Sequence, residues 1–66
     1  MIYAFLANGF EECEAIAPID ILKRAGFEVV TVGVNGKTAV GAHNIPIICD
    51  VTLDEIGCQN IEAIIS

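Results

Sequence analysis

The stretch that decides the fold is residues 2–34, IYAFLANGFEECEAIAPIDILKRAGFEVVTVGV. Residues 2–7 are continuously apolar, which is typical of a strand buried on both faces. Residues 11–25 show helical spacing, with acids in the first turn, bases in the last and Gly26 placed to end the helix. Residues 27–34 are rich in β-branched side chains and predict a second strand. Strand, helix and strand in this order predict a parallel crossover, the opening unit of an α/β sheet.

Shorter elements are predicted beyond residue 34. Asn35 and Gly36 form a turn dipeptide, so residues 37–40 are expected to return as a short strand or hairpin arm. Residues 45–49 contain Pro46, which has no amide donor and belongs at a sheet edge or a strand start.

Two more elements are predicted near the end of the sequence. Residues 53–56 form a short helical turn, capped by Thr52 or Asp54 and ended by Gly57. Residues 61–65 are apolar and predict another buried strand.

Pro18 lies inside the predicted helix, where it cannot donate to the carbonyl of Glu14. The helix is therefore kinked there or starts later than the acids suggest. Either geometry places Glu11, Glu12 and Glu14 just after the first strand, at the sheet edge where α/β sites form. The simpler interpretation is that these acids only complement the helix dipole, at about 0.3–1 kcal/mol each.

Composition indicates a piece of a larger fold. The chain has 66 residues, of which 55% are hydrophobic and 18% charged, with a mean hydropathy of +0.67. A single core below about 70–80 residues rarely supplies more than a few kcal/mol without staples. The predicted strands are apolar on both faces, and one full helix cannot cover both. We therefore expect the remainder of the same domain to cover the other face.

The charge balance excludes a nucleic-acid footprint and disfavours an anionic membrane surface. The net charge is −6, and the basic residues are limited to three: Lys23, Arg24 and Lys37. Phosphate binding needs clustered Lys and Arg, which this sequence lacks.

Three cysteines, Cys13, Cys49 and Cys58, form no C-x-x-C pair. Neither a disulfide framework nor a zinc site is indicated, and free thiols favour a reducing cytoplasm. The first residues lack a basic segment, and their apolar run is too short for a signal sequence or a membrane span. A soluble, cytoplasmic protein is expected.

Residues 7–20, ANGFEECEAIAPID, and residues 22–26, LKRAG, carry a family resemblance. The pattern G-x-E-E-x-E, followed by P-x-D and R-A-G, resembles the ThiJ/PfpI family in its protein deglycase branch. The likeness extends over the whole chain but over only the N-terminal third of the family's domain. It implies a flavodoxin-like α/β sandwich, usually a homodimer, with residues 1–66 as the N-terminal part of one domain.

The resemblance also implies a function. The family's nucleophilic cysteine lies on a strand-to-helix turn that would follow Ser66, and no cysteine of this chain matches it. Glu14 matches the family's catalytic-site carboxyl, which hydrogen-bonds the cysteine sulfur. Such a carboxyl, partly removed from water beside a thiolate, stays protonated and can donate to the sulfur. The implied activity is cofactor-free glyoxalase or deglycase chemistry on small reactive carbonyls, and residues 1–66 alone would be inactive.

A second class of function stays open. The same cysteine could serve a non-catalytic sensor of oxidative stress or a chaperone, and fold likeness alone does not separate this class from an enzyme. Some relatives carry names from thiamine-precursor biosynthesis or intracellular proteolysis, and no residue here supports either.

The remaining polar residues receive structural interpretations. Cys13 and Cys49 are expected to be packing residues, and Cys58 to lie exposed in a loop. His43 has no ligand partner at metal spacing and is expected to be a surface or interface histidine. Asp20 and Arg24 are one helical turn apart and predict an i,i+4 pair. Because the family's corresponding helix lies near the dimer interface, the resemblance also gives this pair an intersubunit role.

Overall fold

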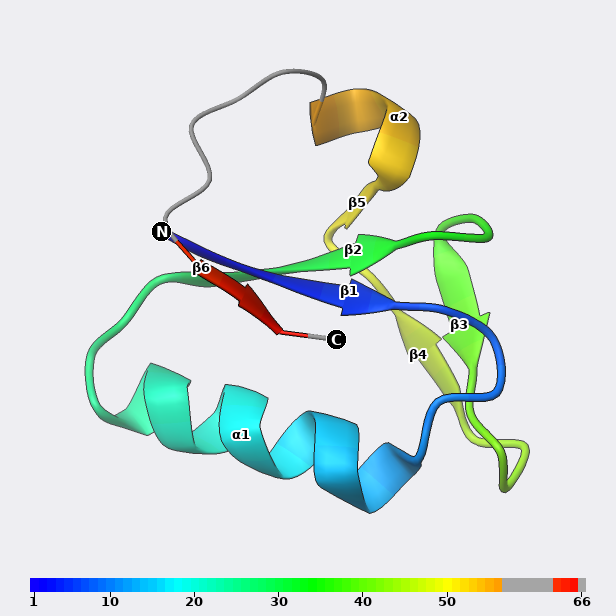
Figure 1. Cartoon of the computed structure of the whole chain (residues 1–66), viewed down its shortest axis with the longest axis horizontal. Coiled ribbons are helices and arrows are strands. Elements are labelled where there is room, and N and C mark those ends of the chain that lie inside the picture. Colours follow the sequence, from blue (N-terminus) through cyan, green and yellow to red (C-terminus); the bar gives the residue numbers. More distant parts are fainter. Residues whose placement is uncertain (57–62, 66) are drawn as a thin grey trace.

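The computed structural model describes residues 1–56 and the backbone of residues 63–65. Its elements within these residues are six strands and two helices, and the strand–helix–strand opening follows the predicted order (Figure 1). They are β1 (Ile2–Leu6), α1 (Glu12–Arg24), β2 (Val29–Gly33), β3 (Thr38–Val40), β4 (Pro46–Ile48), β5 (Val51–Thr52), α2 (Leu53–Ile56) and β6 (Ala63–Ile65). The predicted α/β class and the main elements are confirmed, with boundaries shifted by one or two residues.

The main sheet has the strand order β5-β2-β1-β6, and its strands are parallel (Figure 1). β1 pairs with β2 from Ile2 opposite Val29 to Leu6 opposite Gly33. β1 thus lies between β2 and β6, an interior position for the first strand that suits a flavodoxin-like sheet. The predicted parallel crossover is confirmed.

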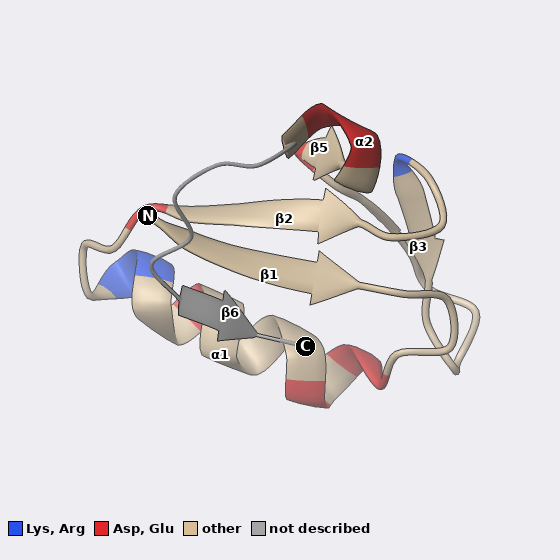
Figure 2. Cartoon of the chain, turned by 45° about the horizontal axis from the view of Figure 1, so that its top comes forward, with Lys and Arg blue, Asp and Glu red and all other residues tan. Residues whose placement is uncertain are grey.

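Buried side chains lie on both faces of β1, since successive side chains of a strand point to opposite sides. On one face α1 packs against the sheet, and Ala4, Ile19 and Val29 form a buried cluster. On the other face Tyr3 and Val32 pack with Ile56 of α2. Figure 2 shows α1 and α2 on opposite sides of the sheet.

The ends of α1 are set by local hydrogen bonds. Glu11 is the N-cap, and its side chain accepts a hydrogen bond from the amide of Cys13. At the other end Gly26 adopts φ 94°, and its amide donates to the carbonyl of Lys23. The amide of Phe27 donates to the carbonyl of Leu22, which completes a Schellman motif. Phe27 therefore belongs to the helix cap and not to the predicted strand, and it is 55% exposed.

Pro18 lies inside α1 without ending it. The helix begins at Glu12 and runs through Pro18 to Arg24. The expectation that the helix starts later than the acids is wrong, because the acids themselves occupy its first turn. In the part of the chain that the structure describes, neither α1, with 13 residues, nor α2 is long and apolar enough to cross a membrane.

β3 and β4 form a separate antiparallel hairpin. Pro46 is the first residue of β4, as predicted. The turn at Asn35 and Gly36 leads from β2 to β3, but β3 pairs with β4 and not back onto β2. The loop that closes the hairpin is residues 41–45, where Asn44 adopts φ 64°. Below the hairpin, Leu6, Ala39 and Cys49 form a third buried cluster.

The short α2 begins beside hydrogen bonds between Thr52 and Glu55. The carboxylate of Glu55 accepts hydrogen bonds from the amide of Thr52 at 2.7 Å and from its hydroxyl at 3.1 Å. Thr52 directly precedes α2, in the predicted cap position, and the Asp54 alternative is wrong because Asp54 lies within the helix. The two-residue strand β5 was not predicted, because so short a strand has no readable periodicity. Gly57, Cys58 and residues 61–62 of the predicted last strand lie outside the described residues.

Candidate functional site

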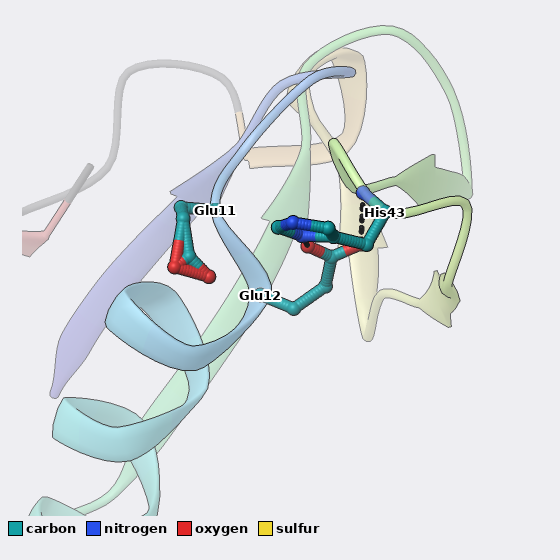
Figure 3. A group of neighbouring side chains, drawn as sticks. All are labelled: Glu11, Glu12 and His43. Carbon is teal, nitrogen blue, oxygen red and sulfur yellow. Dashed lines mark hydrogen bonds and ion pairs between the residues drawn. The ribbon is translucent and has the colours of Figure 1, made fainter.

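The candidate site lies where β1 ends and α1 begins. In an open parallel sheet, ligands bind outside the carboxyl ends of the strands. At this edge the first turn of α1 meets the 41–45 loop of the hairpin, and Figure 3 shows Glu11, Glu12 and His43 gathered there.

Glu12 is a buried acid, and both of its carboxylate oxygens have hydrogen-bond partners. Its side chain is 10% exposed. Oε2 accepts from the amide of His43 at 2.8 Å and from the amide of Ile45 at 3.3 Å. Oε1 lies 2.8 Å from Nδ1 of His43, whose side chain is 70% exposed. An ionised carboxylate only accepts, so Nδ1 carries the proton in this pair.

The contact between Glu12 and His43 shifts the pKa of both side chains. Burial of Glu12 by itself opposes ionisation, but hydrogen bonds from the His43 ring and from the amides of Glu12, His43 and Ile45 outweigh it. Together they lower the pKa of Glu12 from 4.5 to about 2. The hydrogen bond and the charge of Glu12 raise the pKa of His43, and Glu11 adds to this rise. Near pH 6 both members are therefore charged.

The loop fits closely around the Glu12 carboxylate. A methyl group on Gly41 would collide with that carboxylate, so a larger residue at position 41 would displace the Glu12 side chain. The amide of Ala42 donates to the carbonyl of Phe10 at 2.7 Å, and the amide of Gly9 donates to the carbonyl of Val40 at 2.8 Å. The hairpin thus braces both the β1–α1 loop and the start of the helix.

Glu14 lies on the same helical turn but is exposed. It lines a surface depression of about 240 Å³ at the carboxyl end of β1. The depression, called here the Glu14 depression, is lined by Leu6, Phe10, Glu11, Glu14 and Ala15. A carboxyl group beside apolar and aromatic side chains is suited to contact a small, partly polar molecule.

A second depression of about 200 Å³ lies at the carboxyl ends of β2 and β5. It is lined by Gly33, Val34, Asn35, Gly36, Thr52, Leu53 and Asp54. Among these, Asp54 is the one ionisable side chain, whereas the Glu14 depression has two, Glu11 and Glu14. The second depression therefore has fewer groups that could take part in a reaction.

Glu11, Glu12 and His43 bring carboxylate and imidazole atoms within 4.8 Å of one another. Their hydrogen bonds argue against a cation. Glu12 accepts three N–H groups, Glu11 accepts the amide of Cys13, and the positive end of the helix dipole lies beside both. We assign this cluster to the packing of the loop and not to a metal.

The structure corrects two expectations about polar residues. His43 is exposed as predicted, but it has a partner that the sequence analysis missed, Glu12. Glu12 does more than complement the helix dipole, because its carboxylate organises a loop 31 residues away. A signal was present: Glu12 falls on the same helical stripe as Ile16 and Ile19, which face the sheet.

The two described cysteines and the Asp20–Arg24 pair lie on the surface or in the core. Cys49 is buried, and burial together with the charge of Asp50 raises the pKa of its thiol, which suits the predicted packing role. Cys13 is exposed, so the packing role predicted for it is wrong. Asp20 and Arg24 form the predicted pair, with Nε of Arg24 3.0 Å from Oδ2 of Asp20.

The sequence matches the DJ-1/PfpI family over residues 1–65. The chain belongs to this family. It is 38% identical over 61 residues to protein DJ-1 homolog B of Arabidopsis thaliana, a match that covers 91% of this chain and 14% of that protein. It is 32% identical over 59 residues to a deglycase of Pyrococcus horikoshii, covering 89% of this chain and 36% of the relative.

Solved DJ-1 structures share the fold. A DJ-1 superfamily protein from Salmonella typhimurium, crystallised as a cysteine-to-alanine mutant, aligns with a TM-score of 0.90 and 38% identity. The alignment covers 96% of this chain and 35% of that one. Oxidized Toxoplasma gondii DJ-1 aligns with a TM-score of 0.89 and 26% identity, covering 96% of this chain and 35% of that one. This DJ-1/PfpI chain thus spans about a third of these two structures.

Proposed function

We propose that the intact protein carrying this chain acts through a cysteine outside residues 1–66 on small reactive carbonyls, in glyoxalase or deglycase chemistry. Glu14 is the residue of this chain that contacts the reacting thiol. The observation that carries the proposal is the exposed Glu14 carboxyl lining an apolar depression at the carboxyl end of β1. The deglycase of Pyrococcus horikoshii among the relatives supports this class of reaction.

The chemistry assigns Glu14 a definite role. A thiolate that adds to the aldehyde carbon of methylglyoxal forms a hemithioacetal, whose oxygen takes up a proton. Proton transfer between the two carbons then gives a lactate thioester, and one water releases lactate and the free thiol. In this proposal the carboxyl group of Glu14 hydrogen-bonds the sulfur and so tunes the fraction of thiolate.

Several properties of the intact protein accompany this proposal. Residues 1–66 form the N-terminal part of a single domain, and the remainder of that domain supplies the nucleophile. The protein forms a homodimer, with Asp20 and Arg24 near the interface, and it resides in the cytoplasm. It needs no cofactor, because the thiol and Glu14 supply the proposed chemistry.

The test is conversion of methylglyoxal to lactate by the intact protein. Glu14→Gln keeps the size of the side chain but replaces its carboxyl group by an amide, a weaker hydrogen-bond donor to the sulfur, and turnover should fall by about tenfold, the effect of about 1.4 kcal/mol. Glu28→Gln is the matched control, because Glu28 is exposed beside the amino end of β2, at the opposite edge of the sheet. Equal turnover in the two variants would remove Glu14 from the mechanism.

A second function, a sensor of oxidative stress, is favoured by one observation. The Toxoplasma gondii DJ-1 that aligns with this chain is the oxidized protein. In a sensor, Glu14 stabilises the oxidised sulfur instead of tuning turnover. Oxidation-dependent partner binding without lactate formation would select this function over the enzyme.

A further inference from the structure

Glu12 and the 41–45 loop define each other's conformation. Two loop amides, those of His43 and Ile45, point at the same carboxylate oxygen of Glu12. Gly41 leaves the space that the carboxylate fills, and Asn44 takes the left-handed conformation that turns the chain around it. Removing the negative charge would leave two backbone donors facing an uncharged group.

We propose that Glu12 and His43 form a pH-dependent clasp that fixes the first turn of α1 against the hairpin and so positions Glu14. Glu12 is thus a positioning residue, and it does not contact the reacting atoms. The clasp itself is independent of the proposed function, whereas its effect on catalysis through Glu14 rests on that function.

The clasp is connected to the Glu14 depression in two ways. Glu12 and Glu14 occupy the same turn of α1, so a shift of the backbone at Glu12 also moves Glu14. Phe10 lines the depression, and its carbonyl accepts from the amide of Ala42 in the loop. Opening the loop would therefore move both the carboxyl group of Glu14 and the apolar wall beside it.

The pH dependence follows from the charges that face His43, namely the carboxylates of Glu12 and Glu11. The pKa of His43 is raised, so its stabilising contribution is complete below 6.5 and is lost as the pH rises through the raised value. The pKa of Glu12 is lowered to about 2, so its contribution is complete above 4.5 and is lost toward pH 2. The clasp is tightest between these limits, and the neutral ring keeps the hydrogen bond but not the ion pair.

The test is an NMR titration of the intact protein that follows the His43 ring, the amides of residues 43 and 45, and the side-chain carboxyl of Glu14. In the wild type, the protection of the two amides, measured as the intrinsic exchange rate at each pH divided by the observed rate, should fall several-fold as His43 loses its proton. The Glu14 carbon resonance should shift over the same pH range. Glu12→Gln should bring the pKa of His43 down and accelerate exchange at every pH.

Two further variants keep the test decisive if Glu12→Gln does not fold. His43→Gln retains the backbone donor but cannot ionise, so the pH step in protection should vanish while the amides stay partly protected. Glu28→Gln should behave as the wild type. Unchanged protection of the two amides across the His43 titration would overturn the clasp. A Glu14 resonance that does not shift over the same pH range would overturn the positioning role of Glu12.

Failure of this inference and failure of the proposed function give different results. If methylglyoxal turnover is absent but the protection and resonance steps are present, the proposed function is wrong and the clasp stands. If Glu14→Gln loses turnover but His43 titrates equally in the wild type and in Glu12→Gln, the clasp is wrong and the function stands.

Discussion

The β1–α1–β2 unit and the β3–β4 hairpin are held by different kinds of interaction. The unit is held by burial of apolar side chains, as where Ile19 of α1 packs against Ala4 and Val29. The hairpin also has an apolar contact, at Leu6, but its closing loop is fixed by hydrogen bonds to Glu12. Apolar burial depends little on pH, whereas the hydrogen-bonded loop depends on two titrating groups.

The comparison locates stability and function in different places. The stabilisation from burying apolar side chains scales with the area removed from water, and it changes little when those side chains shift slightly. A carboxylate that accepts directed hydrogen bonds fixes a position instead, which a site at the end of β1 requires. Changes in the unit should therefore affect unfolding, and changes in the hairpin loop should affect the site.

The largest expected effect is on the unit, from Ile19→Ala. Ile19 is buried between α1 and the sheet, so truncation leaves a cavity and should lower the free energy of unfolding of the intact protein by about 2–5 kcal/mol. The control is Lys23→Ala on the same helix, where the side chain is exposed and the change should stay within about 0.5 kcal/mol. Urea unfolding measures both, and equal losses would contradict the packing of α1 described here.

The next effect is on the hairpin, from Gly41→Ala. The added methyl group collides with the Glu12 carboxylate, so the pKa of His43 should return toward its ordinary value in an NMR titration. Gly26→Ala is the control: nothing crowds its side-chain position, but φ 94° costs about 1–2 kcal/mol in stability. Gly26→Ala should therefore lower stability and leave His43 unchanged. The reverse pattern would refute the division between the two regions.

The smallest effect is expected from Arg24→Ala on the surface of α1. The pair with Asp20 is largely exposed, and such i,i+4 pairs contribute about 0.3–0.5 kcal/mol. Thermal unfolding at a concentration that favours monomers should show little change. Sedimentation of the intact protein tests the proposed interface role, which requires weaker dimerisation in Arg24→Ala than in Lys23→Ala, its exposed neighbour.

The sequence predicted the apolar part of the fold well. Continuous runs and helical spacing identified β1, α1 and β2, and Gly26 was recognised as the helix end because its role is local. The hairpin pairing was harder, since Asn35 and Gly36 are a strong turn signal wherever the next strand goes. What decides the pairing is the packing of Ala39 and Cys49 against Leu6, which is not local in sequence.

The candidate site was only partly predictable. Glu14 was selected through the family pattern, and the structure adds the depression that it lines. The Glu12–His43 pair was not predictable from local spacing, because its partners are 31 residues apart. No spacing rule relates a helix start to a distant hairpin loop. The position of Glu12 on the buried stripe of α1 was the available clue. A buried acid requires partners, and those partners are the feature to search for.

The most direct test of the account is titration of the reactive thiol in the intact protein, with Glu14→Leu beside the wild type. Glu14 is exposed on α1 and lines the depression, so its replacement should change the acidity of the thiol and its rate of reaction with peroxide more than it changes unfolding. We predict a shifted thiol pKa and an altered peroxide rate at nearly unchanged stability. An identical thiol pKa and an identical peroxide rate in the two proteins would contradict the role of Glu14 and leave it as a residue that only complements the helix dipole.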